Sequence, residues 1–259
     1  MNFLSFSRLF PATASSPPTY PGEVAITLNR LTIVRLLGTV AVFLILANIA
    51  AQCVRHITSH ESVYGLIPLF NVDQENNLPS YFSASLLLIS AVLLSIISIE
   101  KRKTQAMWAL HWIILAFTFL YLSIDEAASL HELLIRPTRE FFGRKTGLLY
   151  TAWVIPGIVA TVIFAFSFLT FFLNLPTRTR RFVLLAAILY IGGALGMELV
   201  ANGYFERHGD DLTYAMLVTV EEGLEMAGAI VFINALMIYI EANYNEIRFR
   251  FKRNRPPQA

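Results

Sequence analysis

The chain has 259 residues, of which 56% are hydrophobic and only 15% are charged. Soluble domains carry roughly 25% charged residues, and a soluble core of this size could not bury so much apolar surface, whereas a bilayer can cover it. The formal net charge of +2 gives no reason to expect a nucleic-acid partner, and the single cysteine, Cys53, excludes an internal disulfide and a multi-cysteine metal site.

Six segments are apolar and long enough to cross a bilayer, which takes roughly 20 residues of helix. We predict spans over 33–54, 80–99, 106–130, 149–173, 182–203 and 213–240. The predicted fold is therefore all-α, a polytopic membrane helix bundle of about six transmembrane helices in a lipid bilayer. We expect a flexible cytoplasmic tail over 1–30, the bundle over 31–243 and a basic cytoplasmic tail over 244–259.

Clusters of Lys and Arg predict the orientation, because cytoplasmic loops of membrane proteins are enriched in both residues. Basic residues follow the second, fourth and sixth spans, and an even number of spans places these loops on the same side as both termini. We therefore expect a multi-pass protein with both termini in the cytoplasm. Residues 131–147 carry basic residues on the opposite side, and we expect them to lie along the outer interface, with a helix break at Pro137.

The loops and span ends carry further predictions. The loop FNVDQENNLPSYFS is expected to be an exposed turn, in which Asp73 and Glu75 are solvated, although they could also contact a cation. Pro79 suits the first turn of the helix that follows. Aromatic residues near span ends are expected to anchor the protein at the membrane interface, namely Trp108, Trp112, Tyr150 and Trp153.

The third, fifth and sixth spans contain acidic residues, which distinguishes them from the other three. In the third span, Asp125, Ser129 and Glu132 are spaced i, i+4, i+7 and are predicted to share one helix face. In the fifth span, Glu198 and Asn202 have the same i, i+4 relation. The candidate site residues are Asp125, Glu126, His131, Glu132, Glu198, Glu221, Glu222 and Glu225.

These acids are costly inside a membrane. A charge at the bilayer centre costs at least about 2.5–3.5 kcal/mol, and no Lys or Arg lies in the middle of a predicted span to offset it. Protonation, hydration or a bound cation can each relieve this cost. The helix directions place the three acidic sets at similar depth. Gly192 and Gly196 form a GxxxG pair, and with Gly193, Gly223 and Gly228 nearby these glycines permit close helix approach. The sequence therefore predicts an intramembrane carboxylate site.

Several carboxylates and one histidine form a ligand set for a hard or borderline cation, so a divalent metal such as iron, manganese, zinc or calcium is expected if a metal binds. The chain has no Glu-x-x-His motif, which counts against a di-iron oxygenase. A second interpretation stays open, in which Asp125 and Glu126 mark the end of the third span and pair with Arg136 or Arg55.

Short motifs resemble known sequences. The run EEGLE, Glu221–Glu225, resembles the REGLE element of membrane iron permeases, with Glu221 in place of the arginine. His56 and His60 have the His-x-x-x-His spacing of zinc sites in membrane hydrolases of the ceramidase and progestin-receptor type, but no comparable pattern lies near the last span. Together, FNVDQENNLP, SIDEAASLHE and TVEEGLEMAG resemble a group of uncharacterised bacterial membrane proteins, which implies a bacterial inner membrane and no particular function.

SIDEAASLHE and TVEEGLEMAG each hold an acidic pair in the third span of one half, which indicates two three-helix halves of inverted topology. Three functions stay open. The first is transport-related binding of a proton or metal cation. The second is a membrane-embedded metalloenzyme acting on a lipid-like substrate, with a metal held among Asp125, His131, Glu132, Glu198 and Glu225. The third is a non-catalytic sensor or assembly subunit whose acids pair with a partner. The oligomeric state is left open.

Overall fold

The structure is a computed structural model that describes residues 29–58, 60–143 and 152–244. These residues form helices and turns, with no strand among them. The predicted tails at 1–30 and 244–259 lie outside the described residues, apart from residues 29, 30 and 244. The predicted all-α bundle is confirmed, because six helices are long and apolar enough to cross a membrane: α1 (Arg30–Thr58), α3 (Leu78–Lys103), α4 (Ala109–Ala128), α6 (Val154–Leu173), the continuous helix Thr177–His208 and α9 (Leu212–Asn243).

The fifth span, Thr177–His208, is made of three parts. These are α7 (Thr177–Ile191), the π-helical segment η3 (Gly192–Met197) and α8 (Glu198–His208). π-helical turns inside α-helices are rare overall, and those that occur often lie at functional sites. Three short helices lie between the spans, namely α2 (Leu66–Phe70), the 3-10 helix η1 (Leu130–Leu134) and α5 (Ile135–Phe142).

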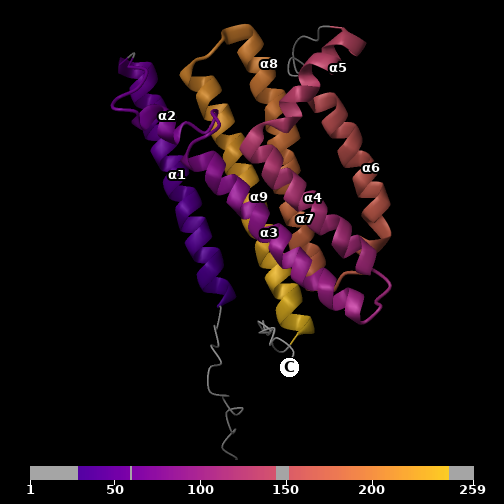
Figure 1. Ribbon diagram of the computed structural model, residues 1–259. Helices are drawn as coiled ribbons and strands as arrows, with labels where there is room; N and C mark the ends of the chain where they lie inside the picture. Colours follow the sequence, from indigo (N-terminus) through magenta and orange to yellow (C-terminus); the bar gives the residue numbers. More distant parts are fainter. Residues whose placement is uncertain (1–28, 59, 144–151, 245–259) are drawn as a thin grey trace, which may run out of the picture.

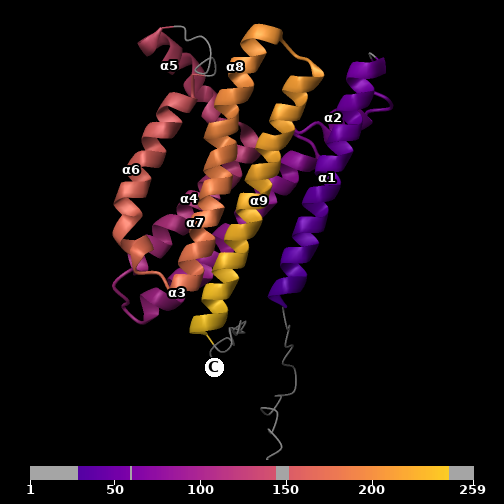
Figure 2. The same ribbon diagram turned by 180° about the vertical axis from the view of Figure 1, so that it is seen from behind.

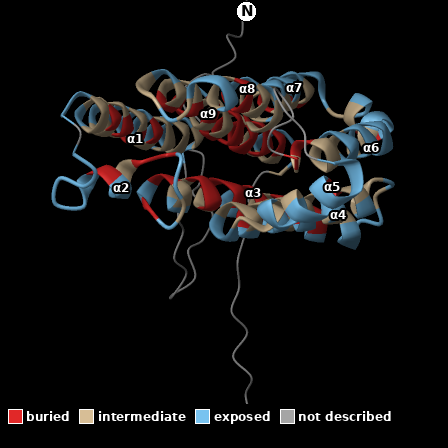
Figure 3. Cartoon of the chain, turned by 90° about the horizontal axis from the view of Figure 1, so that it is seen from above, coloured by how far each residue is buried: buried red, intermediate tan, exposed pale blue. Residues whose placement is uncertain are grey.

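The spans form two rows, with α1, α9 and α7–α8 in one row and α3 and α4 in the other, as Figure 3 shows from above. α1 and α6 lie at opposite edges (Figures 1 and 2). α9 is the central helix, since it packs against α1, α3 and α7. The most extensive contacts join α3 to α4 and α7 to α9, which are the second and third spans of each predicted half.

Both ends of the described chain lie at the same end of the bundle, called here the terminal end. There Arg30 at the start of α1 donates from Nε to Oε2 of Glu241, near the end of α9, at 3.0 Å. The opposite end, called the α5 end, carries η1, α5 and the turn between α8 and α9 (Figure 1). Here Arg55 at the end of α1 forms an ion pair with Asp210 at 2.6 Å. Polar contacts therefore fasten α1 at both of its ends.

Large apolar side chains occupy both the interior and the outward faces. Leu94 and Leu236 are fully buried between the two rows, whereas Ile163 and Phe166 of α6 are 62% and 75% exposed. An exposed apolar face of this kind is compatible with a lipid environment. The prediction for Trp112 was wrong, because its side chain is buried inside the bundle rather than at an interface.

Two glycines bring α7–η3 and α9 into close contact. A Cβ atom added to Gly228 would lie 2.6 Å from the backbone nitrogen of Tyr190, and one added to Gly193 would lie 2.8 Å from the carbonyl oxygen of Glu221. By contrast, a Cβ atom on Gly192 or Gly196 would have no neighbour within 4 Å. The close approach therefore depends on Gly193 and Gly228 and not on the predicted GxxxG pair.

The end of α4 differs from the prediction. The helix stops at Ala128, because Ser129 adopts a left-handed conformation with φ of 47° and the 3-10 helix η1 follows. Asp125, Ser129 and Glu132 consequently do not share one α-helical face. Oδ1 of Asp125 accepts a hydrogen bond from the backbone N–H of His131 at 2.6 Å, so this side chain replaces the helical carbonyl partner. The predicted break at Pro137 is also wrong, since Pro137 lies in the first turn of α5, where proline is tolerated.

The loop between α2 and α3 is folded onto the bundle, although an exposed turn was predicted. Asn71 and Asn77 are buried. The Nδ2 group of Asn77 donates to the carbonyl oxygens of Asn71 and Gln74 at 2.6 and 2.8 Å. Asn77 also forms a capping box with Ser80 at the start of α3, which satisfies free N–H groups of that helix. The loop is therefore an ordered cap at the α5 end.

The glycine contact yields a first prediction. Gly228→Ala should lower the stability of the detergent-solubilised protein by about 1–3 kcal/mol, because the methyl group forces α7 away from α9. Thermal unfolding followed by size-exclusion fluorescence measures the change. Gly196→Ala is the matched control, since its methyl group meets no neighbour, and equal unfolding temperatures for the two variants would contradict the packing described above.

Candidate functional site

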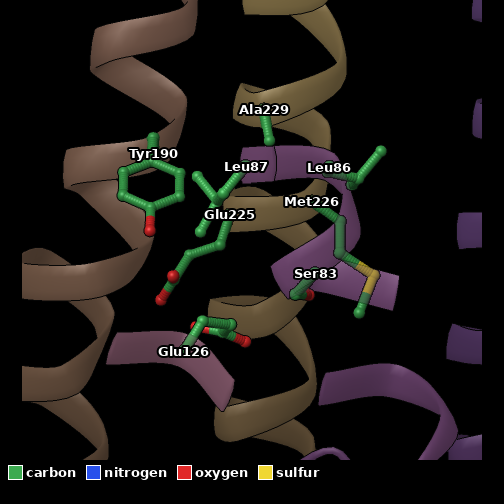
Figure 4. A pocket seen from close by; sticks show the side chains of 8 residues that line it. All are labelled: Ser83, Leu86, Leu87, Glu126, Tyr190, Glu225, Met226 and Ala229. Carbon is green, nitrogen blue, oxygen red and sulfur yellow. The ribbon is translucent and has the colours of Figure 1, made fainter. Parts of the chain in front are cut away.

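Acidic and hydroxyl side chains from four helices line one small cavity inside the bundle. Glu126 comes from α4, Glu225 from α9, Tyr190 from α7 and Ser83 from α3. Figure 4 shows the carboxyl group of Glu225 directed toward the Tyr190 hydroxyl and Glu126, with Ser83 beside Met226. The volume open to the centre of a water molecule is ≈ 10 Å³, about the space that a single water molecule needs.

Among the polar side chains of the cavity, Ser83 has a buried hydroxyl group without a hydrogen-bond partner in the described chain. Its side chain is only 6% exposed, and Oγ has no hydrogen-bond partner among the described residues. Most serines within helices donate to a carbonyl oxygen one turn earlier, as Ser90 on the same helix does to Leu86 at 3.0 Å. A buried hydroxyl without a partner costs about 1–3 kcal/mol, so this oxygen is available to a group that enters the cavity.

The cavity lies well inside the bundle. Glu225 is thirteen residues after Leu212, the first residue of α9, which corresponds to about 20 Å of helix. Glu126 interacts electrostatically with Glu225, and α4 ends two residues later at Ala128. α4 therefore ends far below the turn that joins α8 to α9, and η1 and α5 complete the chain above it (Figure 1).

A second group of acids adjoins the cavity. The carboxyl groups of Glu198 and Glu221 lie within hydrogen-bonding reach of each other. Glu198 also accepts hydrogen bonds from Nδ2 of Asn202 at 2.9 Å and from Nε1 of Trp153 at 3.3 Å. The Asn202 contact agrees with the predicted shared face, whereas Trp153 was expected at the interface. Glu225 interacts electrostatically with both Glu126 and Glu198, so the two groups form one acidic cluster.

Asp125 and His131 form a pair at the α5 end of this cluster. Nδ1 of His131 lies 3.1 Å from Oδ2 of Asp125, and the two side chains are 28% and 15% exposed. The His131 ring also packs against Trp153 with a centroid separation of 4.6 Å. Burial lowers the pKa of His131, but the hydrogen bond and negative charge of Asp125 outweigh it, so the pKa is raised above its usual value.

Glu222 faces a third acidic region, next to the α2–α3 loop. It interacts electrostatically with Glu126 and with Asp73 and Glu75 of the loop. Partial loss of hydration raises the pKa of Asp73 to about 6, although the hydrogen bond from the hydroxyl group of Tyr214 lowers it. Asp73 is exposed, as the prediction of solvated loop charge expects, and Glu75 is half-buried. Both loop acids nevertheless belong to the acidic surroundings of Glu222.

Buried amides fix the loop above these acids. Nδ2 of Asn48 donates to Oγ1 of Thr219 at 2.8 Å, and Oδ1 of Asn48 accepts from the backbone N–H of Val72 at 3.3 Å. Gln52 donates to Asn71 and, more weakly, to Asn48. This network connects α1, α9 and the loop. The sequence did carry a signal for it, because two amides spaced i, i+4 interrupt an otherwise apolar span.

The glutamates of the cluster have no Lys or Arg ion-pair partner within the part of the chain that the structure describes. No Lys or Arg there forms an ion pair with Glu126, Glu198, Glu221, Glu222 or Glu225. The open interpretation, in which Arg55 or Arg136 pairs with Asp125 and Glu126, does not match the ion pairs found. Arg55 pairs with Asp210, and Arg136 pairs with Glu140 at 2.9 Å.

The predicted metal ligands are only partly brought together. Glu132 is exposed and lies outside the cavity, because α4 ends before it. Over residues 29–58, 60–143 and 152–244, no three His, Cys, Asp or Glu residues are close enough to hold a metal ion by themselves. His60 is exposed and contacts Thr58, and His56 lies 3.9 Å from Asp210. Sequence reasoning missed Ser83 and Tyr190, since a serine and a tyrosine in apolar spans carry no distinctive signal.

The Asp73–Tyr214 contact yields a second prediction. Tyr214→Phe removes a hydrogen bond that favours the ionised carboxylate, so the pKa of Asp73 should rise above about 6. NMR titration of protein labelled with ¹³C at the aspartate carboxyl, assigned with Asp73→Asn, measures this. Tyr204→Phe is the control, because that hydroxyl donates to Asp211 instead, at 2.8 Å. A midpoint that stays constant or falls in Tyr214→Phe would refute the contact.

Comparisons with known proteins identify the family of the chain. Neither the comparison with curated proteins nor the one with solved structures gave a match. A family model with the description "Domain of unknown function (DUF8692)" matches residues 36–240. This match runs from the first turns of α1 to the last turns of α9 and covers well over half of the chain, so the protein belongs to the DUF8692 family.

Proposed function

We propose that this protein is an integral membrane protein in which the acidic cluster binds a proton or a metal cation and passes it across the bilayer. The observation that supports this most directly is the cavity shared by Glu126 and Glu225. Both carboxyl groups lie inside the bundle without a Lys or Arg ion-pair partner in the described chain, next to the unpartnered hydroxyl of Ser83. Acids in such a position mark ion or proton pathways in membrane proteins by default.

Several carboxylates lie close together in the bundle, and their free-energy costs of burial add up. One charge costs at least about 2.5–3.5 kcal/mol at the bilayer centre, and like charges placed side by side add to that cost. The cluster is stable only while protons, water or a cation reduce its negative charge. A cation or proton carrier needs a site that holds positive charge and can release it. The acidic cluster has this property, because it is stable only while positive charge or water offsets its own negative charge.

The local backbone also suits a site that changes its occupancy. α4 ends beside Glu126, and η3 ends directly before Glu198. Irregular backbone at membrane depth is tolerated where it is buried in protein or lines a cavity. Both interruptions lie next to acids of the cluster, while α9, which carries Glu221, Glu222 and Glu225, is an unbroken helix.

We further propose that the terminal end faces the cytoplasm of a bacterial cell and the α5 end faces outward. The positive-inside tendency supports this orientation, because the terminal end carries the larger basic clusters: Arg30, Lys101, Arg102, Lys103, Arg178, Arg180 and Arg181. The acidic cluster is then closer to the outer side, and an ion from outside meets the Asp73 loop and the Asp125–His131 pair first.

The proposal predicts the behaviour of neutralised variants. Purified protein in liposomes that contain a pH-sensitive dye should take up protons, or Mn²⁺, Fe²⁺, Zn²⁺ or Ca²⁺ with an appropriate dye, when a potassium-diffusion potential is imposed. Glu225→Gln and Glu126→Gln should reduce this flux at least about tenfold, because glutamine keeps the shape but cannot ionise. Glu140→Gln should leave the flux unchanged, since Glu140 is exposed on α5.

Stability provides a second measurement on the same variants. An uncompensated buried charge destabilises a fold, so neutral glutamine at position 225 should keep or raise the thermal unfolding temperature in detergent. Lost flux together with unchanged or higher stability is the expected combination. Wild-type flux of every tested ion in the Glu126→Gln/Glu225→Gln double variant would rule out this function.

A further inference from the structure

We infer that the cavity between Ser83, Glu126, Tyr190 and Glu225 is a binding site for one dehydrated, hard divalent cation of the Mn²⁺ or Ca²⁺ type. This inference rests on the proposed function, because it names the ion class that the acidic cluster handles. It also assigns two ligands, the hydroxyl groups of Ser83 and Tyr190, that an inventory of acids and histidines does not contain.

The polar side chains that line the cavity offer oxygen ligands. All four polar groups present oxygen, and Figure 4 shows no nitrogen or thiolate among them; the only sulfur is the thioether of Met226, beside Ser83. Carboxylate and hydroxyl oxygens suit Mg²⁺, Ca²⁺ and Mn²⁺, whereas imidazole and thiolate favour zinc, copper and iron–sulfur centres. His131 interacts with Asp125 and Trp153 instead and does not line this cavity. Leu86, Leu87, Met226 and Ala229 complete the lining, and its four oxygen-bearing side chains favour a hard cation.

The charge of the two carboxylates and the number of oxygen atoms around the cavity both suit one divalent cation. Two ionised carboxylates supply a charge of −2, which one divalent cation balances. Two bidentate carboxylates and two hydroxyl groups provide six oxygen atoms, and Ca²⁺ takes six to eight oxygen ligands. Among the described residues, no three His, Cys, Asp or Glu side chains lie close enough to hold a metal ion. This absence is compatible with the inferred site, because the site uses only two acids.

The hydroxyl group of Ser83 lacks a hydrogen-bond partner among the described residues. Its Oγ atom is buried and has no partner among the described residues, although Glu126 and Glu225 line the same cavity. A hydroxyl group with no other function would be expected to donate to a nearby carbonyl, as Ser90 does. A buried oxygen atom without a partner, in a cavity that two acids also line, is available to coordinate a cation.

The small volume of the cavity limits which ions can enter it. The space open to the centre of a water molecule is ≈ 10 Å³, and this is about one water-sized sphere. A fully hydrated cation does not fit such a space, so the ion must lose its water shell. Mg²⁺ dehydrates reluctantly and usually retains several waters, which favours Mn²⁺ and Ca²⁺ over Mg²⁺ at this position.

Titration of the purified protein with Mn²⁺ tests the inference. Electron paramagnetic resonance measures free Mn²⁺ in solution, and wild-type protein should bind one equivalent, displaced by Ca²⁺ more readily than by Mg²⁺. Glu126→Gln or Glu225→Gln should weaken Mn²⁺ binding at least about a hundredfold, and Ser83→Ala or Tyr190→Phe about tenfold. Ser90→Ala is the matched control on α3, because Ser90 does not line the cavity, and its Mn²⁺ affinity should equal that of the wild type.

The outcomes separate this inference from the proposed function. Absence of Mn²⁺ and Ca²⁺ binding, or binding that Ser83→Ala and Ser90→Ala weaken equally, overturns the inferred site. If proton flux still depends on Glu225 in that case, the proposed function stands with the proton as its ion. One bound equivalent of Mn²⁺ that the Ser83, Glu126 and Glu225 variants bind more weakly than Ser90→Ala supports the site, even where no flux is detected.

Ser83→Ala also separates coordination from a structural role. Removing a buried hydroxyl that has no partner should leave the unfolding temperature of the metal-free protein unchanged or slightly higher. Added Mn²⁺ should raise the unfolding temperature of the wild type more than that of Ser83→Ala, since a ligand stabilises the fold in proportion to its affinity. Equal metal-dependent shifts in both proteins would contradict the assignment of Ser83 as a ligand.

Discussion

The structure depends on one constraint, which is that several carboxyl groups must share a small, poorly hydrated volume inside an apolar bundle. Glu126, Glu198 and Glu225 interact electrostatically, and no described Lys or Arg pairs with them. The surroundings meet this constraint in different ways. Asn202 and Trp153 donate hydrogen bonds to Glu198, Glu221 lies within hydrogen-bonding reach of it, and Glu126 and Glu225 share a cavity with two hydroxyl groups.

The close contact between α7 and α9 follows from the same constraint. Gly193 and Gly228 let the backbones approach until a Cβ atom would no longer fit. This approach brings Tyr190 next to Glu225 and leaves little space between them. Larger residues at either glycine would widen the gap, admit more water and change the environment of the acids. Packing and the electrostatic properties of the cluster are therefore coupled through two residues without side chains.

Much of the architecture was predictable because it follows from the length and composition of apolar segments. All six spans were found from the sequence, and the depth arguments for the three acidic helices agree with the electrostatic interactions of Glu225 with Glu126 and Glu198. The end of α4 was not predictable by periodicity, since it depends on a single side-chain contact from Asp125 to the backbone of His131. The free hydroxyl of Ser83 arises from tertiary packing, whereas the cap formed by Asn77 is local, because its partners lie between Pro68 and Ser80.

The π-helical segment η3 has a consequence for how the fifth span could vary. A π turn accommodates one residue more than an α turn, so every side chain after η3 is rotated by about 100° relative to an uninterrupted α-helix. Glu198 and Asn202 lie directly after this segment. Loss of one residue between Gly192 and Met197 would restore a regular helix and rotate both side chains away from Glu221 and α9. The orientation of the fifth span's polar face is thus set by the number of residues in this segment, while the absence of a side chain at Gly193 sets how closely the segment approaches α9.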